Sequence, residues 1–331
     1  MQLEDETGQS VDKSTDNNLE KFSDPDRTAK GETRASVPLW KLETLWINTG
    51  TLCNITCRNC YILSSPTNDS LVYLTAAEAM SFIREAKTMG AVEIGFTGGE
   101  PFLNPEILEM IGGTLDLGLR VLVLTNAMQP MRRPRIADGL LALRERAVDR
   151  MTLRVSLDHH DRARHDEERG EGSFEKTVDG IDWLVAHGFH VAIAGRSLWR
   201  ENREEALEGY QRLSDARGWS LDARDTSQLV IFPEMDGSHD VPEITEACWG
   251  ILGKSTRDVM CASSRMVVKR KGADRPVVLP CTLLPYESRF EMGETLAAAA
   301  EAHGGMFDRG AVKLCHAHCA KFCVLGGGSC S

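Results

Sequence analysis

Apolar residues fall into two alternating patterns from residue 42 onward. Short apolar runs of four to seven residues, typical of buried strands, occupy residues 42–48, 92–96, 119–124, 151–157, 190–194 and 229–232. Segments with helical spacing lie between them, at 75–89, 105–117, 136–146, 174–187 and 203–215. Alternating strands and helices with short links predict parallel strands joined by helical crossovers. Six strands indicate an α/β fold, a partial (β/α)6 barrel, with reactive loops at the C-terminal ends of the strands.

The two ends of the chain lack this alternation. Residues 1–36 are polar and acidic, which predicts a disordered tail. Beyond residue 233 glycine, proline and cysteine become more frequent, and six of the ten cysteines follow Met260. We therefore expect a tail at 1–36, a barrel at 37–235 and a small cysteine-rich domain at 236–331.

Charge and composition narrow the classes of function. The formal net charge of −11 disfavours a large nucleic-acid interface, because an acidic chain repels polyphosphate. No run of 18 or more apolar residues occurs, and the N-terminus lacks the features of a secretory signal, so no membrane partner is expected. The expectation is a cytoplasmic protein, in which clustered cysteines are more often metal ligands or catalytic groups than disulfides.

The loop after the first strand carries the most specific motif. It reads TLCNITCRNCY, and it spaces Cys53, Cys57 and Cys60 as C-x3-C-x2-C. Three thiolates can hold three irons of a [4Fe–4S] cube and leave the fourth iron open, whereas clusters that only transfer electrons usually have four cysteine ligands. Zinc is the alternative, but zinc sites favour C-x2-C pairs closed at four ligands.

This loop, with Tyr61 directly after the third cysteine, resembles the signature of the radical S-adenosylmethionine (radical SAM) superfamily. The second strand ends in FTGGEP, which is similar to the glycine-rich motif that contacts the amino group of the methionine moiety in that family. In physical terms, Gly98 and Gly99 allow close backbone approach, and Glu100 offers a hydrogen-bond acceptor. The resemblance extends over about residues 42–232.

The later strand ends agree with this resemblance in their order. Thr125 and Ser156 resemble the polar strand ends that meet ribose and carboxylate oxygens of the cofactor. Arg196, at the end of the fifth strand, is either a partner of the cofactor carboxylate or a surface arginine. Residues 158–166, with three histidines, and 232–237 are candidates for substrate contacts, and the histidines are either proton carriers or solvated loop residues.

A second set of cysteines lies in the C-terminal part: Cys261, Cys281, Cys315, Cys319, Cys323 and Cys330. These segments resemble the auxiliary-cluster extensions of radical SAM enzymes called SPASM and twitch. The spacing of the last four departs from the usual SPASM order. One auxiliary [4Fe–4S] cluster held by four of the six thiols is the favoured interpretation. Two clusters, a zinc site with His316 or His318, and free cysteines remain as alternatives.

The resemblance implies a reaction. The reduced cluster would pass an electron to S-adenosylmethionine, and the resulting 5′-deoxyadenosyl radical would take a hydrogen atom from a substrate. A flavodoxin- or ferredoxin-type reductant would supply the electron. A second cluster would accept an electron from the substrate radical or anchor the substrate.

Two substrate classes and one other class of protein stay open. A small molecule in cofactor or natural-product biosynthesis is favoured, because the polar tail suggests no N-terminal peptide-binding domain. A SPASM-type peptide or protein maturase is the alternative. A non-catalytic iron–sulfur carrier or sensor is disfavoured by the Gly-Gly-Glu-Pro motif, since a carrier needs no nucleotide site.

Overall fold

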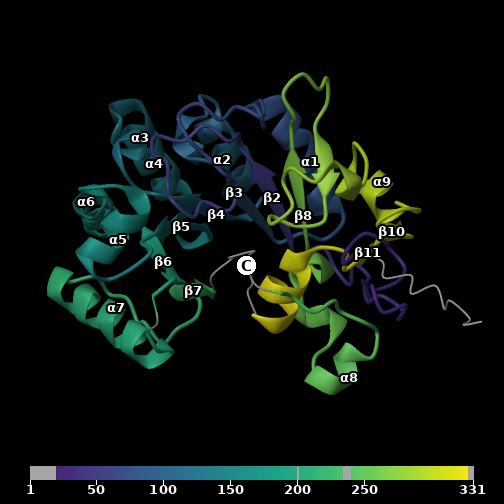
Figure 1. The fold of residues 1–331 in the computed structure, drawn as a ribbon. Helices are drawn as coiled ribbons and strands as arrows, with labels where there is room; N and C mark the ends of the chain where they lie inside the picture. Colours follow the sequence, from purple (N-terminus) through teal and green to yellow (C-terminus); the bar gives the residue numbers. More distant parts are fainter. Residues whose placement is uncertain (1–19, 200, 234–239, 327–331) are drawn as a thin grey trace, which may run out of the picture.

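The computed structural model describes residues 20–199, 201–233 and 240–326, and an eight-stranded curved sheet forms its centre (Figure 1). The strand order is β7-β6-β5-β4-β3-β2-β8-β9, and all neighbours are parallel except β8 and β9. The bounds are β2 (Thr44–Asn48), β3 (Glu93–Thr97), β4 (Arg120–Thr125), β5 (Met151–Ser156), β6 (His190–Ser197), β7 (Leu229–Pro233), β8 (Ser264–Val268) and β9 (Val277–Leu279). The six predicted strands are β2 to β7, which confirms the partial barrel.

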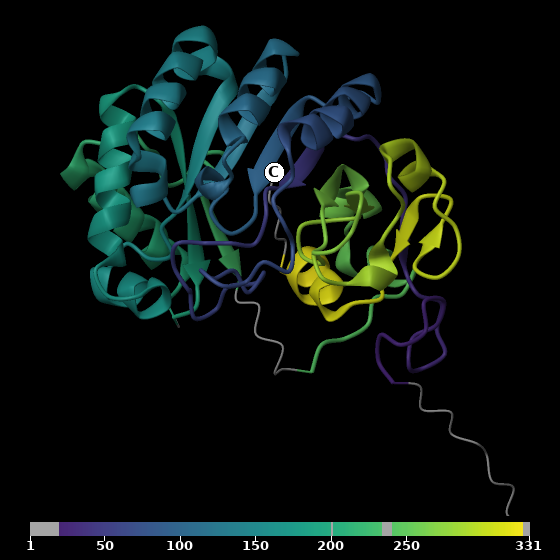
Figure 2. The same ribbon diagram turned by 90° about the horizontal axis from the view of Figure 1, so that it is seen from above.

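Helices cover the outer face of the sheet (Figure 2). The five predicted helices are α1 (Ala76–Thr88), α2 (Ile107–Asp116), α4 (Pro134–Ala147), α6 (Ser173–Ala186) and α7 (Arg203–Arg217). Thr75 and Glu78 form the capping box expected at the start of α1. Within the barrel, two short helices were not predicted, α3 (Gln129–Arg132) and α5 (Arg162–Arg169). The sequence of α5, RARHDEER, has no apolar period that could reveal it.

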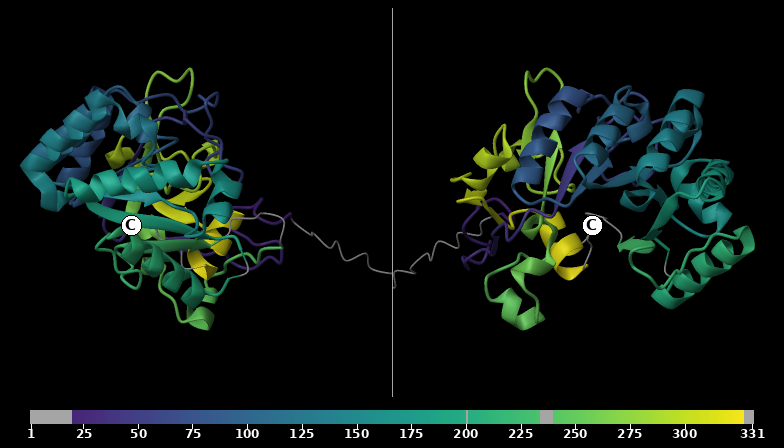
Figure 3. Two further views of the ribbon diagram at one scale, coloured as in Figure 1. Left: turned by 90° about the vertical axis from the view of Figure 1, so that its left-hand side faces the viewer. Right: turned by 180° about the vertical axis from the view of Figure 1, so that it is seen from behind.

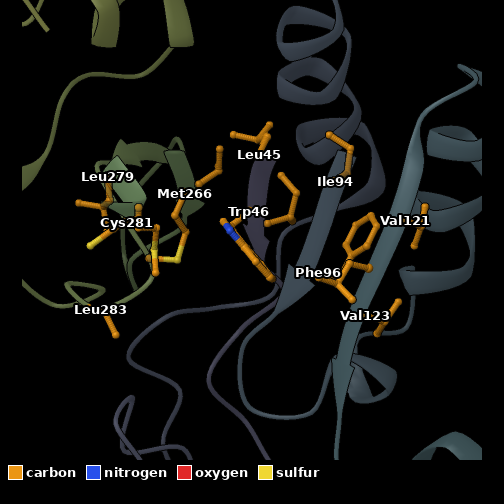
Figure 4. Close-up of a cluster of buried hydrophobic side chains, with 14 of the residues drawn as sticks. Leu45, Trp46, Ile94, Phe96, Val121, Val123, Met266, Leu279, Cys281 and Leu283 are labelled. Atoms are coloured by element: carbon orange, nitrogen blue, oxygen red, sulfur yellow. The ribbon is translucent and has the colours of Figure 1, made fainter. Parts of the chain in front are cut away.

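The core runs without a break from the barrel strands into the cysteine-rich part (Figure 4). Trp46 on β2 is fully buried and lies against Gly95 of β3, where a Cβ atom would come within 2.3 Å of the indole ring. Met266 of β8 is level with Trp46 and shares its face of the sheet, whereas Ile94 and Phe96 point to the other face of β3, beside Val121 and Val123 of β4. Glycine at position 95 therefore makes room for the largest side chain of the core.

The sheet continues beyond residue 235, the expected domain boundary. Strand β8 pairs in parallel with β2, so the cysteine-rich part completes the sheet rather than standing apart from it. The remaining elements are a small sheet, short helices and a π-helix: β1 (Ser36–Val37), β10 (Phe307–Asp308), β11 (Ala311–Lys313), α8 (Cys248–Leu252), α9 (Leu296–Ala300), the π-helix Cys319–Leu325, and one-turn 3₁₀ helices at Pro101–Leu103, Val148–Arg150, Thr256–Asp258, Met260–Ala262 and Ser288–Phe290.

The N-terminal segment differs from the expected tail over residues 20–36. Arg34 is 3% exposed and forms an ion pair of 2.6 Å with Glu243, and Ser36 begins β1, which pairs with β11. These partners lie more than 200 residues away, so a search for local apolar periodicity could not find them. Residues 1–19 lie outside the described part of the chain. Within that part, no helix is long and apolar enough to cross a membrane.

Candidate active site

A single cavity gathers the ends of the barrel strands and the cysteine loop. Nine of the sequence-predicted residues line it: Cys53, Cys57, Cys60, Tyr61, Gly98, Gly99, Thr125, Ser156 and Arg196. They come from the C-terminal ends of five different strands or from the loops directly after them, which is the arrangement expected of a site at the C-terminal ends of parallel strands. Asn126, directly after Thr125, also lines the cavity, as does Arg169, which was not singled out from the sequence.

Hydrogen bonds hold the cysteine loop in place before any metal is bound. The Cys53 backbone N–H donates to Ser65 O at 3.0 Å, and the Ser64 N–H donates to Cys60 Sγ at 3.3 Å. The Asn126 side chain donates to Asn54 Oδ1 at 2.8 Å and lies 3.9 Å from Cys53 Sγ. Burial raises the pKa of Cys53 to about 12, so a bound cation is needed to keep this sulfur as a thiolate.

The spacing of these thiols fits an iron–sulfur cluster better than zinc. A zinc ion with bonds of 2.3 Å would bring its thiolate ligands to within about 3.8 Å of one another. Among the described residues, the three cysteines are not a group whose ligand atoms all lie within 4.8 Å. An iron–sulfur cube separates its cysteine ligands more widely, because each cysteine binds a different iron.

Glycine is required in the Gly98–Gly99 turn by the protein's own backbone. Gly98 has φ +138°, and a Cβ atom there would lie 2.4 Å from Gly50 O. A Cβ on Gly99 would lie 2.2 Å from Leu52 O. Any side chain at either position would therefore push the end of β3 away from the start of the cysteine loop. The two glycines were expected to let the backbone come close to a cofactor. In the structure they also let it come close to the loop that carries Cys53.

The Glu100 side chain points to β4, in contrast to its expected role as an acceptor for the cofactor. Its carboxylate accepts hydrogen bonds from Thr125 Oγ1 and Asn126 N, each at 2.9 Å, and from Phe102 N at 3.2 Å. It is 1% exposed, and burial raises its pKa to about 7. Glu100 thus fixes the end of β4, where Thr125 and Asn126 face the cavity.

Arg169 brings a largely buried positive charge to the cavity. Its Nε and Nη2 each lie 2.8 Å from a carboxylate oxygen of Asp158, and the charge of Arg169 lowers the pKa of that carboxyl. Arg196 reaches the cavity from β6 and donates from Nη1 to Asn59 O at 3.0 Å. The sequence indicates Arg196, at the end of a predicted strand. It could not indicate Arg169, because Arg169 lies on α5, whose sequence has no apolar period.

Helix α5 also attaches to the cysteine loop. The Arg58 backbone N–H donates to Glu168 O at 2.8 Å, and the Arg58 side chain pairs with Glu167 at 2.8 Å. The Asn59 amide donates to both carboxylate oxygens of Glu168, at 2.8 and 3.0 Å. The loop between Cys57 and Cys60 is therefore fixed to a helix that follows the fourth barrel strand.

Four of the six C-terminal thiols line a second cavity, which is mostly apolar: Cys261, Cys281, Cys319 and Cys323. Cys315 faces elsewhere, since its Sγ donates to Phe22 O at 3.1 Å and to Asp24 O at 3.3 Å. Cys330 lies outside the described residues. Burial raises the pKa of Cys261 to about 11 and also raises that of Cys319. As with the first three cysteines, no three of these four described thiols have sulfur atoms that all lie within 4.8 Å of one another.

The histidines of residues 158–166 lie away from the first cavity. His159 and His160 lie with Glu201 in a group whose ligand atoms are within 4.8 Å of one another. However, His159 Nδ1 accepts from the Asp161 N–H at 2.8 Å, so its proton is on Nε2, 2.9 Å from Glu201 Oε2. His159 then has no lone pair left for a cation. His165 is fully buried, and burial lowers its pKa to about 4.

Comparisons with known proteins agree with this site. The family model described as the Radical SAM superfamily matches residues 47–213. The chain is 32% identical over 163 residues to the AdoMet-dependent heme synthase of Methanosarcina barkeri, covering 48% of this chain and 43% of that protein. It is 30% identical over 259 residues to the antilisterial bacteriocin subtilosin biosynthesis protein AlbA of Bacillus subtilis, covering 73% of this chain and 54% of AlbA. The chain thus spans about half the length of the curated relatives it matches.

Solved structures show the same fold. SuiB of Streptococcus suis bound to S-adenosylmethionine matches with a TM-score of 0.59 at 14% identity, covering 80% of this chain and 66% of SuiB. SuiB bound to precursor peptide SuiA matches with a TM-score of 0.56 at 14% identity, covering 81% and 65%. The family model covers more than half of the 331 residues, including the cysteine loop from Cys53 to Cys60. The chain therefore belongs to the radical SAM superfamily, with a SPASM/twitch-like, cysteine-rich C-terminal domain.

Proposed function

We propose that this protein is a radical SAM enzyme that abstracts a hydrogen atom from a peptide substrate bound over the first cavity. Bound in that cavity, a [4Fe–4S] cluster and S-adenosylmethionine would supply the electron and the 5′-deoxyadenosyl radical. The observation that carries the radical chemistry is the meeting of three cysteines and five polar or glycine residues from the ends of four strands around one cavity.

Different residues of this chain would hold the cluster and S-adenosylmethionine. Cys53, Cys57 and Cys60 would bind three irons and leave one open to the amino and carboxylate groups of S-adenosylmethionine. A carboxylate needs a positive partner in a buried site. Arg169 and Arg196 line the cavity and can supply that charge, each as a guanidinium with several N–H donors.

The polar strand ends would place the nucleoside. Ser156 lines the cavity with Gly98 and Gly99, so its hydroxyl can meet ribose or carboxylate oxygens, whereas the Thr125 hydroxyl donates to Glu100 and can only accept from a ribose hydroxyl. Leu124 and Ile62 supply apolar surface beside them, which suits the adenine ring. The mostly apolar lining of the cavity would also keep water from a reactive radical.

The second cavity is proposed to hold an auxiliary cluster on Cys261, Cys281, Cys319 and Cys323. Leu283 lines both cavities, so the two proposed sites are adjacent. Such closeness suits transfer of an electron from a substrate radical to the auxiliary cluster. The net result would be oxidation of the substrate.

The choice of a peptide as the substrate class rests on how much of this chain each relative matches. AlbA, a bacteriocin biosynthesis protein, is similar over 73% of this chain, and this match reaches beyond the barrel. The heme synthase, which favours the small-molecule alternative, is similar over 48%. The longer match supports a peptide, and a small molecule remains the second candidate.

The test is reductive cleavage of S-adenosylmethionine. Anaerobically reconstituted protein with dithionite is expected to form 5′-deoxyadenosine, and the Cys57→Ala variant is expected to form none, because two cysteines cannot hold the site-differentiated cube. Cys248→Ala is the matched control, since Cys248 lines neither cavity and accepts a hydrogen bond from the Thr245 N–H. Formation of 5′-deoxyadenosine by Cys57→Ala at the wild-type rate would contradict the proposal.

A further inference from the structure

Strand β7 is the last strand of the sheet on the barrel side, and among the described residues no strand pairs with its outer edge, although Gly326 lies close to the Pro233 side chain. Ile193 N donates to Gln228 O at 2.7 Å, and Ile193 is opposite Leu229. In a parallel ladder alternate residues face the same neighbour. The backbone N–H and C=O groups of Val230 and Phe232 therefore point to β6. Those of Leu229 and Ile231 point to the outer edge.

The outward backbone groups of β7 offer one complete pairing position. The Leu229 N–H already donates to Asp225 O at 2.9 Å. Pro233 has no N–H. Ile231 thus presents the one outward donor on this strand together with its own carbonyl acceptor. A single residue of an extended chain can accept and donate at this position.

The same strand forms a wall of the first cavity. Phe232 lines the cavity, and its ring stacks on Phe322 of the π-helix with ring centroids 5.8 Å apart. Figure 3 shows β7 at the edge of the sheet, with the C-terminal π-helix beside it. Side chains alternate between the faces of a sheet, and neighbouring strands are about 4.8 Å apart. A chain paired with β7 would therefore point every second side chain to the face on which Phe232 meets the cavity.

We propose that the peptide substrate binds as an added strand on the outer edge of β7, with its backbone hydrogen-bonded to Ile231 and one side chain directed into the cavity. This inference rests on the proposed function and specifies how its substrate class is held. Main-chain pairing gives affinity without demanding a sequence, and the pocket beside Phe232 selects the side chain. A small molecule has no extended backbone and cannot use this edge.

The experiment uses the reconstituted enzyme and a library of random 12-residue peptides as the probe. Peptides selected for binding to the wild-type enzyme are expected to bind Ile231→Pro at least about tenfold more weakly, because proline removes the donor and its ring obstructs the edge. Ile231→Val keeps the N–H and is expected to bind within about twofold of wild type. Iron content equal to that of the wild type shows that the proline variant has folded around its clusters.

A second measurement applies if the proline variant loses its iron. Each backbone nitrogen of a selected peptide is methylated in turn, and binding to the wild-type enzyme is measured. One or two methylated positions are expected to abolish binding. Equal binding to Ile231→Pro, or tolerance of methylation at every position, would overturn the edge pairing. Failure to select any peptide, with a wild-type enzyme that forms 5′-deoxyadenosine, would overturn it too and leave the radical chemistry standing.

Discussion

Glu100 shows what a single buried carboxylate contributes to the cavity. It accepts three hydrogen bonds from Phe102, Thr125 and Asn126, and two of these donors come from the end of β4. The motif could be recognised in the sequence, and so could Thr125. The direction of the Glu100 side chain could not, because its partners follow 25 and 26 residues later and depend on the pairing of β3 with β4.

The first prediction at this scale concerns pH. The folded-state pKa of Glu100 is about 7 and its ordinary value is 4.5, so the protonated form is favoured by folding and stability is lost as pH rises through 7. Between pH 6 and pH 8 this loss amounts to about 1 kcal/mol. Urea unfolding of Glu100→Gln is expected to lack this component. Glu109→Gln, at an exposed position, is expected to keep the wild-type dependence, and equal slopes for all three proteins would contradict the assignment.

At the scale of elements, α5 is a helix that the sequence did not predict and that holds the cysteine loop in place. The five helices with apolar periods could be predicted, since each buries a face against the sheet. Helix α5 instead contributes charge: Glu167 and Glu168 hold the loop, and Arg169 enters the cavity. A charged octapeptide has no feature that separates such a helix from a solvated loop before its partners are known.

The second prediction is that α5 governs how firmly the first cluster is held. Glu168→Ala removes the acceptor for the Asn59 amide, and a hydrogen bond to a charged group contributes about 1.5–3 kcal/mol. The loop should open more often, and a chelator should bleach the cluster absorbance at least about tenfold faster. Glu171→Ala, exposed and two residues beyond the helix, serves as the control. Bleaching of both variants at one rate would argue against the clamp.

At the scale of the whole molecule, the barrel and the cysteine-rich part form one sheet and one core. The sequence shows a change of composition near residue 235. The eight-stranded sheet nevertheless includes strands from both sides of that position, because β8 pairs with β2. The segment from Arg34 to Val37 closes on the C-terminal part in the same way. Local patterns predict elements, but these pairings depend on residues far apart in the chain. The result places two sets of cysteines in adjacent cavities that share Leu283.

The most direct test of this account is to count and identify the clusters after removing each set of cysteines. The wild type is expected to hold about eight irons, and its electron paramagnetic resonance signal in the reduced state should change when S-adenosylmethionine is added. The Cys53→Ala, Cys57→Ala, Cys60→Ala protein should keep about four irons and lose that change. The Cys261→Ala, Cys281→Ala protein should also keep about four irons but retain the change. Loss of all iron from the first variant, or a response to S-adenosylmethionine that survives in it, would contradict the account.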